Sequence, residues 1–257
     1  MQRLVISLEQ VRDRQLTLTE AQQHYLSRVL RLGVGDRFLA MDGQGATWLA
    51  VLAQGHPHLQ AELLEAVVVQ TELAVAVTLV AALPKGNGFD EVVRQATELG
   101  VATISPIISE RTLLQPSPQK LARWRRIAQE AAEQAERQIV PKIEEPLSWE
   151  NYLRQNQEPA GLKLICVARG RYPSLMQILS QPCAGHFTPT LLAIGPEGGW
   201  TKAEVERAIS VGYQPVSLGN RILRAVTAPI VALALAIALL EEATVTRESL
   251  PGEAPER

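Results

Sequence analysis

Residues 190–240, which read TLLAIGPEGGWTKAEVERAISVGYQPVSLGNRILRAVTAPIVALALAIALL, decide the fold of this chain. Two short apolar runs within them, 191–194 and 215–218, have the length and composition of buried parallel strands. Each run leads into a glycine-bearing turn and then into a helix. In open α/β sheets small molecules bind beyond the carboxyl ends of the strands. We therefore predict that the turns 195–199 and 219–224 lie side by side and form a ligand site.

The composition is that of a globular protein. The 257 residues are 46% hydrophobic, which is enough to fill the core of one large α/β domain or of two domains. The formal net charge of -2 gives no overall attraction to nucleic acid. Any binding to nucleic acid must therefore depend on local basic patches.

The cysteines and histidines indicate neither a cross-link nor a metal. Cys166 and Cys183 are the two cysteines, and we interpret both as reduced thiols of a cytosolic protein. The histidines are scattered, and His56 and His58 are the nearest to a pair. We predict no metal site, because these spacings match no zinc motif.

No segment of the chain reads as a membrane or export signal. The first residues lack the apolar run and cleavage site of a signal peptide. The longest apolar run, 228–240, contains Pro229 and is shorter than the roughly 20 residues that a membrane span needs. We expect a cytoplasmic protein with no membrane contact.

Residues 1–70 predict a small β-barrel domain. Short apolar runs alternate with turn signals at the spacing typical of such barrels. A helix over 19–31, capped by Thr19, would place Arg28 and Arg31 on one face, because they are three residues apart. These arginines either contact phosphate or belong to an ordinary solvated face. The candidate strands are 4–6, 16–18, 37–40, 47–52 and 61–64.

Residues 71–244 alternate between strands and helices, which predicts an α/β domain of about six strands. The helix at 119–138 begins with basic residues and ends with acidic ones, against the helix dipole. The basic residues in its N-terminal half either contact a partner or form an ordinary solvent-exposed charged surface. Residues 245–257 are charged and contain two prolines, so we predict a flexible tail. The predicted strands are 73–83, 102–108, 161–168, 191–194 and 215–218, and the predicted helices are 89–99, 119–138, 174–180 and 228–240.

The common ligand motifs are absent. Neither GxGxxG nor GxxxxGK[ST] occurs, which disfavours dinucleotide binding and nucleotide hydrolysis, and the absence of GxSxG disfavours a nucleophile-elbow hydrolase. What remains is a pair of glycine turns that can bring backbone groups close to a flat, polar ligand. Glu197, Arg221 and Arg224 stand at the rim of these turns. Glycines after strands are also common in simple turns, so the pattern alone leaves both interpretations open.

Several motifs at consistent spacing resemble one known family. The C-terminal motifs are 194–199, 204–205, 217–224 and 227–228; the central ones are 84–86, 96–101, 109–111, 123–124, 131–134 and 140–141; the N-terminal ones are 29–32 and 35–36. They are similar to the signature of the RsmE family of ribosomal RNA small subunit methyltransferases, which belongs to the SPOUT class. The resemblance covers nearly the whole chain.

The resemblance implies a fold and an activity. The fold would be an α/β SPOUT domain over 71–244 with a deep trefoil knot, preceded by a PUA-like β-barrel over 1–70 that binds RNA. The activity would be methylation of N3 of one uridine in 16S ribosomal RNA by a homodimer, with S-adenosyl-L-methionine as the cofactor.

The resemblance also implies the site residues. Glycines let main-chain donors approach a ligand closely. Because uridine N3 carries a proton, the reaction needs a base or a stabilised uracil anion. Arg224 is the candidate for stabilising that charge or gripping a phosphate, and Glu197 either acts as a base or holds its turn through backbone hydrogen bonds. The RNA-binding candidates are Arg28, Arg31, Lys85 and Arg111; the cofactor-binding candidates are Leu192, Ile194, Gly195, Pro196, Gly198, Gly199, Leu218, Gly219, Asn220, Ile222 and Leu223.

The chain departs from the family pattern beside the expected cofactor. Ala225 and Val226 stand where threonine and glutamate are usual, so a carboxylate is missing there. Three hypotheses follow. The first is the methyltransferase; the second is a catalytically weak or inactive rRNA-binding or assembly factor of the same fold, which Ala225 and Val226 favour. The third is a sibling SPOUT methyltransferase acting on tRNA, which the N-terminal barrel and the motif 109–111 disfavour.

Overall fold

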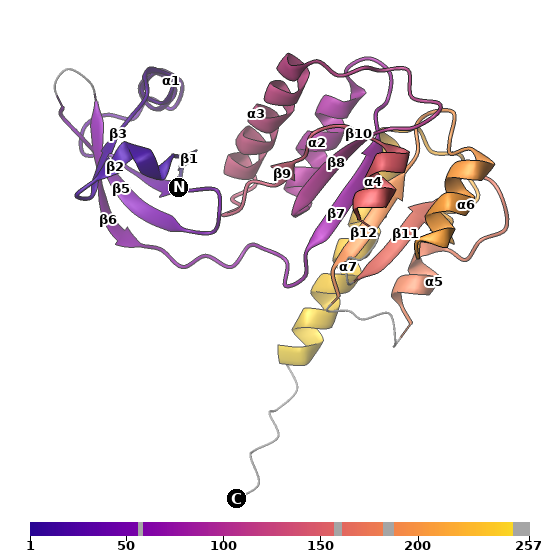
Figure 1. Ribbon diagram of the computed structural model, residues 1–257. Helices are drawn as coiled ribbons and strands as arrows, with labels where there is room; N and C mark the ends of the chain where they lie inside the picture. The colour runs from indigo at the N-terminus through magenta and orange to yellow at the C-terminus, as the bar shows by residue number, and fades with distance from the viewer. Residues whose placement is uncertain (56–58, 157–160, 182–187, 249–257) are drawn as a thin grey trace, which may run out of the picture. The chain divides into compact units, whose positions relative to one another are not determined.

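The structure, a computed structural model, describes residues 1–55, 59–156, 161–181 and 188–248 (Figure 1). The chain divides into two compact units. The first consists of Met1–Glu72 together with Gln129–Val140, and the second consists of Leu73–Ala128 and the residues from Pro141 onward. The sequence placed 129–140 in the second domain, whereas in the structure this segment contacts the first 72 residues.

The first unit is built on a mixed six-stranded sheet in the order β1-β4-β5-β6-β3-β2. β1 runs parallel to β4, and the other neighbours are antiparallel. Among the described residues the edge strands β1 and β2 do not pair with each other, so the sheet is an open half-barrel of PUA-like form. Its core contains Leu16, Leu26 and Phe38, all fully buried. The strands are β1 Arg3–Val5, β2 Val11–Arg12, β3 Gln15–Thr17, β4 Arg37–Met41, β5 Thr47–Ala53 and β6 Gln60–Ala66.

The helix of the first unit is shorter than predicted and changes its winding. Helix α1, Glu20–His24, begins at Thr19, whose hydroxyl accepts the Gln22 N–H as predicted. It continues as one π-helical turn, Tyr25–Val29, and Arg31 beyond it has a φ of 60°. Arg28 and Arg31 therefore do not share a helix face, and that prediction is wrong. Three-residue spacing aligns side chains only where α-helical winding persists.

The segment 129–140 is anchored to the first unit by the Glu72 carboxylate. Helix α3, Pro118–Gln134, ends earlier than the predicted residue 138, and Glu136 has a φ of 61°. Beyond it, Arg137 donates to Glu72 Oε2 at 2.6 Å. The N–H groups of Gln138 and Ile139 donate to Oε1 of the same carboxylate at 2.9 and 3.1 Å. Arg137 is only 3% exposed, so this ion pair lies largely out of water.

The second unit is built on a seven-stranded parallel sheet. The order along it is β10-β8-β7-β12-β11-β13, and β9 also pairs with β8. All five residues of β12 are buried, as expected of a central strand covered on both faces. The strands are β7 Val77–Ala82, β8 Thr103–Ile108, β9 Lys142–Ile143, β10 Leu147–Ser148, β11 Leu162–Cys166, β12 Thr190–Ile194 and β13 Gln214–Val216.

Helices cover both faces of this sheet (Figure 1). α7 packs on α2, α5, β7 and β12. On the other face α4 and α6 bring Trp149 and Val205 into a core cluster with Val80 and Ala193. Besides α3, the helices are α2 Gly88–Glu98, α4 Trp149–Gln155, α5 Leu175–Leu179, α6 Lys202–Ser210 and α7 Thr227–Glu248.

Two further differences separate the second unit from the sequence prediction. The short strands β9 and β10 and helix α4 were not predicted. Helix α7 reaches Glu248, so residues 245–248 are helical, and the rest of the predicted tail, 249–257, lies outside the described residues.

No helix in the part of the chain that the structure describes combines the length and apolar character of a membrane span.

Candidate active site

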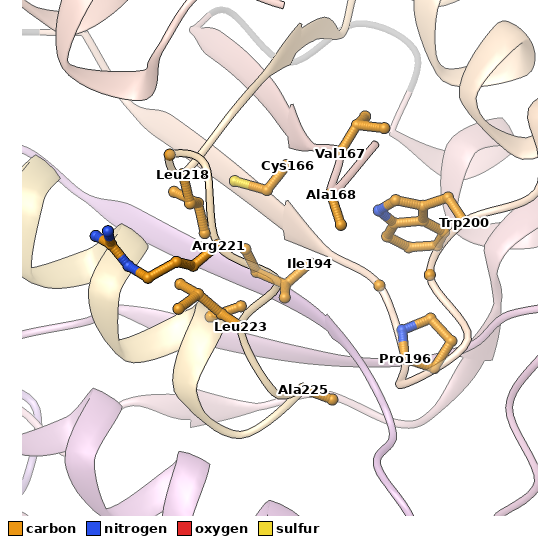
Figure 2. A pocket seen from close by; sticks show the side chains of 14 residues that line it. Cys166, Val167, Ala168, Ile194, Pro196, Trp200, Leu218, Arg221, Leu223 and Ala225 are labelled. Atoms are coloured by element: carbon orange, nitrogen blue, oxygen red, sulfur yellow. The ribbon is translucent and has the colours of Figure 1, made fainter. Parts of the chain in front are cut away.

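Three neighbouring strands end level with one another and create a pocket. Cys166 at the end of β11 pairs with Ile194 of β12 and with Val216 of β13. The loops that follow enclose about 530 Å³ of empty space, the open mouth included. Figure 2 shows Ile194, Leu218 and Leu223 on one side of this pocket and Trp200 across from them. The two glycine turns therefore meet at one site, as predicted.

The pocket contains some of the predicted cofactor-binding residues and several that were not predicted to bind the cofactor. Gly198 and Ile222 line a neighbouring hollow, Asn220 lines a second one, and Leu192 is buried inside β12. The predicted residues in the pocket are Ile194, Gly195, Pro196, Gly199, Leu218, Gly219 and Leu223, and the additional ones are Cys166, Val167, Ala168, Trp200, Arg221, Ala225 and Ala228. Residues 166–168 could have been predicted as part of the site from their place at the end of strand β11, because ligands bind at strand ends in such sheets.

The backbone of Gly195 packs against the indole ring of Trp200 at the edge of the pocket. A Cβ atom on Gly195 would lie 3.2 Å from the Trp200 backbone nitrogen and from two atoms of its indole ring. A side chain at 195 would therefore force the Trp200 ring to move by a few tenths of an ångström. Trp200 is 9% exposed, and its indole nitrogen has no hydrogen-bond partner among the described residues.

The first glycine turn is held by contacts from two other loops. Glu197 Oε1 accepts the backbone N–H of Lys85 at 2.9 Å, and Arg111 Nη1 donates to the Gly198 carbonyl at 2.5 Å. A Cβ atom on Gly198 would come within 2.9 Å of the Arg111 side chain. Glu197 and Arg111 thus fix the turn, and Lys85 is exposed beside it.

A buried carboxylate holds the start of α6 against the loop after β8. Thr201 and Glu204 form a capping box, in which the Thr201 N–H donates to Glu204 Oε2 at 2.8 Å. The other oxygen of Glu204 accepts the Glu110 N–H at 2.8 Å, and the Thr201 hydroxyl donates to Glu110 at 3.1 Å. These contacts explain why the sequence motifs around 110 and 204 occur together.

Four arginines in the loops after β11 and β13 are exposed; Arg221 lines the pocket, whereas Arg224 is not among the described residues that line it. The Arg224 carbonyl accepts the N–H groups of Thr227 and Ala228 at 2.9 Å, so its backbone is fixed at the start of α7 while its side chain is exposed. Arg169, Arg171, Arg221 and Arg224 form no ion pair with any described residue. Their charges are therefore available to an anionic partner.

Two features at the second glycine turn leave it without a carboxylate. Ala225 is buried and lines the pocket. Val226 packs against Gly88, where an added Cβ atom would lie 2.7 Å from the valine Cγ1. An apolar contact therefore occupies the position of the expected glutamate.

Cys166 is a free thiol, and its burial raises the pKa of that thiol to about 12. In a Cys183→Ser variant we expect Cys166 to react with iodoacetamide far more slowly at pH 8 than free cysteine does. The thiolate is the reactive form, so the rate should rise about tenfold for each pH unit between 8 and 10. Mass spectrometry measures the rate, and urea-unfolded protein is the control. Fast alkylation of the folded protein at pH 8 would contradict this burial.

No cluster of three or more potential metal ligands occurs among the described residues. His56, His58, Cys183 and His186 lie outside those residues.

Comparison with known proteins defines the class. A model of an RNA methyltransferase domain matches residues 71–237, and a model of an RNA methyltransferase PUA domain matches residues 18–64. The parallel sheet with a pocket beyond its strand ends, together with the half-barrel unit, is thus the architecture of an RNA methyltransferase.

The relatives define the family. Ribosomal RNA small subunit methyltransferase E from Synechocystis sp. is 52% identical over 93% of this chain and 78% of the relative. The Bacillus subtilis protein of the same name is 30% identical over 91% of this chain and 94% of its own. The crystal structure of ribosomal RNA small subunit methyltransferase E from Neisseria gonorrhoeae bound to S-adenosyl methionine matches with a TM-score of 0.82 at 30% identity, covering 93% of this chain and 98% of that one. The chain belongs to the ribosomal RNA small subunit methyltransferase E family.

Proposed function

We propose that this protein transfers a methyl group from S-adenosyl-L-methionine to N3 of a uridine in 16S ribosomal RNA. The observation that supports this most directly is the pocket between the two glycine turns, in a family with a relative solved with S-adenosyl methionine bound. The bound cofactor would supply an electrophilic methyl group on a sulfonium centre.

The pocket fits such a cofactor. Ile194, Leu218 and Leu223 offer apolar contact, and an unpaired N–H of Trp200 offers a hydrogen bond. The glycines at 195, 199 and 219 leave the backbone accessible. We assign cofactor binding to these loops, with Leu192 supporting them from inside β12.

Arg224 and Glu197 have different roles in this proposal. Loss of the N3 proton leaves negative charge on the uracil, and a preorganised cation stabilises such charge in the transition state. Arg224 has the exposed, unpaired guanidinium for that role, or for holding a neighbouring phosphate. Glu197 already uses Oε1 to bind the Lys85 amide, so we assign it to positioning the cofactor loop.

The RNA would contact basic side chains in each unit. Arg28 and Arg31 are exposed on the PUA-like unit. On the second unit Lys85 and Arg224 are exposed, Arg221 lines the pocket, and the arginines at 111, 169 and 171 line neighbouring hollows. Phosphate contacts of this kind weaken steeply with salt. The proposed domains are an RNA-binding unit near 1–70 and a methyltransferase domain near 71–244.

The knot, the dimer and the location in the cell are also proposals. β11 lies between β12 and β13 although both follow it in the chain, an arrangement that supports a C-terminal segment threaded into a deep trefoil knot. Ile209 and Ile222, 46% and 60% exposed beside the pocket, support a homodimer contact there. Ribosomal RNA as a substrate supports a cytoplasmic location.

Primer extension tests the activity. A strain that lacks the corresponding methyltransferase would be complemented with this chain, and its small-subunit rRNA would be copied by reverse transcriptase. N3-methyluridine blocks base pairing, so we expect a restored stop at one uridine. Complementation without a stop, together with intact cofactor binding, would contradict the proposal.

Val226 supports a second candidate, an rRNA-binding assembly factor that does not catalyse transfer. Its apolar contact with Gly88 occupies the place of the family's usual glutamate. Such a protein would bind small-subunit rRNA and give no labelled product from a radiolabelled methyl donor.

A further inference from the structure

The indole N–H of Trp200 has no hydrogen-bond partner among the described residues although the ring is buried. Leaving a buried donor unpaired costs free energy, and native proteins keep few such groups. Two other tryptophans of the same unit follow that rule: Trp124 donates to Asp90 at 3.0 Å, and Trp149 donates to the Glu204 carbonyl at 3.3 Å. The unpaired donor of Trp200 therefore needs an explanation.

Trp200 lines the pocket, which supplies that explanation. Figure 2 shows the nitrogen edge of the indole turned toward Ala168 and the interior of the pocket. Gly195 on one side and Trp149, whose ring centre is 4.7 Å away, on the other hold the ring in place. The donor is thus fixed in direction before any ligand arrives.

We propose that Trp200 donates its indole N–H to a hydrogen-bond acceptor of the adenosyl ligand, and so contributes to affinity and selectivity for that ligand. This inference rests on the proposed function, because it takes the ligand to be S-adenosyl-L-methionine or its product. A ring nitrogen, a hydroxyl oxygen or a carboxylate oxygen of that ligand would each accept the bond. Trp200 is a binding residue in this role and takes no part in proton transfer.

Trp200→Phe tests the proposal, because phenylalanine keeps a flat apolar ring and removes the donor. Isothermal titration with S-adenosylhomocysteine measures affinity without any dependence on turnover. We expect the dissociation constant to rise about five- to tenfold, the change that corresponds to loss of one net hydrogen bond. The melting temperature of the ligand-free variant should fall modestly, because the smaller ring leaves part of the packing against Trp149 unfilled, so the test rests on the affinity.

Trp124→Phe is the matched control. Its N–H already has a partner in Asp90, and it does not line the pocket. This variant should lower the ligand-free melting temperature and leave the affinity for S-adenosylhomocysteine unchanged.

The possible results separate this inference from the function on which it rests. If the parent protein does not bind S-adenosylhomocysteine, the proposed function is wrong. If the parent binds and Trp200→Phe binds equally well, the role of Trp200 is wrong.

Discussion

Replacing Arg224 with alanine is expected to lower the methyl-transfer rate about 100- to 1,000-fold. That is the size of effect seen when one preorganised donor to a developing negative charge is removed. The Arg224 side chain is exposed and has no ion pair among the described residues, so the folded state does not depend on it. Stability should therefore change by less than about 0.5 kcal/mol.

Single-turnover transfer from a radiolabelled donor to unmethylated small subunits measures the effect. Arg154→Ala is the control, because Arg154 is an exposed arginine on α4 whose ion pair among the described residues is with Glu150 at 3.4 Å. It should transfer at the parent rate. Binding of S-adenosylhomocysteine should be normal in both variants. Parent-like transfer by Arg224→Ala would remove Arg224 from the catalytic machinery.

Replacing Glu72 with alanine is expected to destabilise the protein by about 3–5 kcal/mol. Removing one partner of a largely buried ion pair takes away the nearby counter-charge that offsets the burial of the other. Here the loss also deprives the N–H groups of Gln138 and Ile139 of their acceptor. The backbone beyond α3 would then keep its contacts with Thr47 and Gly43, through Gln138 and Val140, but lose the largely buried ion pair with Glu72.

Urea denaturation followed by circular dichroism measures this loss. Glu145→Ala is the matched control, since the Arg125–Glu145 pair is 51% and 72% exposed at its two side chains. Exposed pairs contribute at most about 1 kcal/mol, so this variant should be nearly as stable as the parent. Equal stability of Glu72→Ala and Glu145→Ala would show that the buried carboxylate is not an anchor.

The longer strands and the meeting of the two glycine turns could be predicted from the sequence because their signals are local. An apolar run such as 191–194 is buried on both faces wherever it lies in a parallel sheet, and a glycine turn after it marks the ligand edge. Gly100, with a φ of 95°, ends α2 as its position in the sequence indicated. Thr19 caps α1 for the same local reason.

The contacts that complete the site depend on tertiary packing and could not be predicted in this way. Nothing near 200 in the sequence shows that the Trp200 ring lies against Gly195 or that its N–H lacks a partner. The Glu197 contact with Lys85 joins residues 112 positions apart. Arg31 leaves the helix because a π-turn precedes it, and no spacing rule reveals such a turn.

The end of helix α3 was predicted wrongly for a related reason. Its sequence continues the helical pattern of 119–128, so a periodicity argument extends the helix to 138. Glu72 overrides that pattern by binding Arg137 and two backbone amides, which are more than 60 positions away in the chain.

The pocket is completed by segments near the C-terminus of the chain, which has a consequence during protein synthesis. The wall of the pocket needs the loop after β13 and the first turn of α7, which leave the ribosome well after β7 and β8 have been made. A nascent chain can thus assemble the early strands while the cleft for the methyl donor is still missing one side. Newly made enzyme becomes competent only when its late segments have emerged and closed around the end of β11.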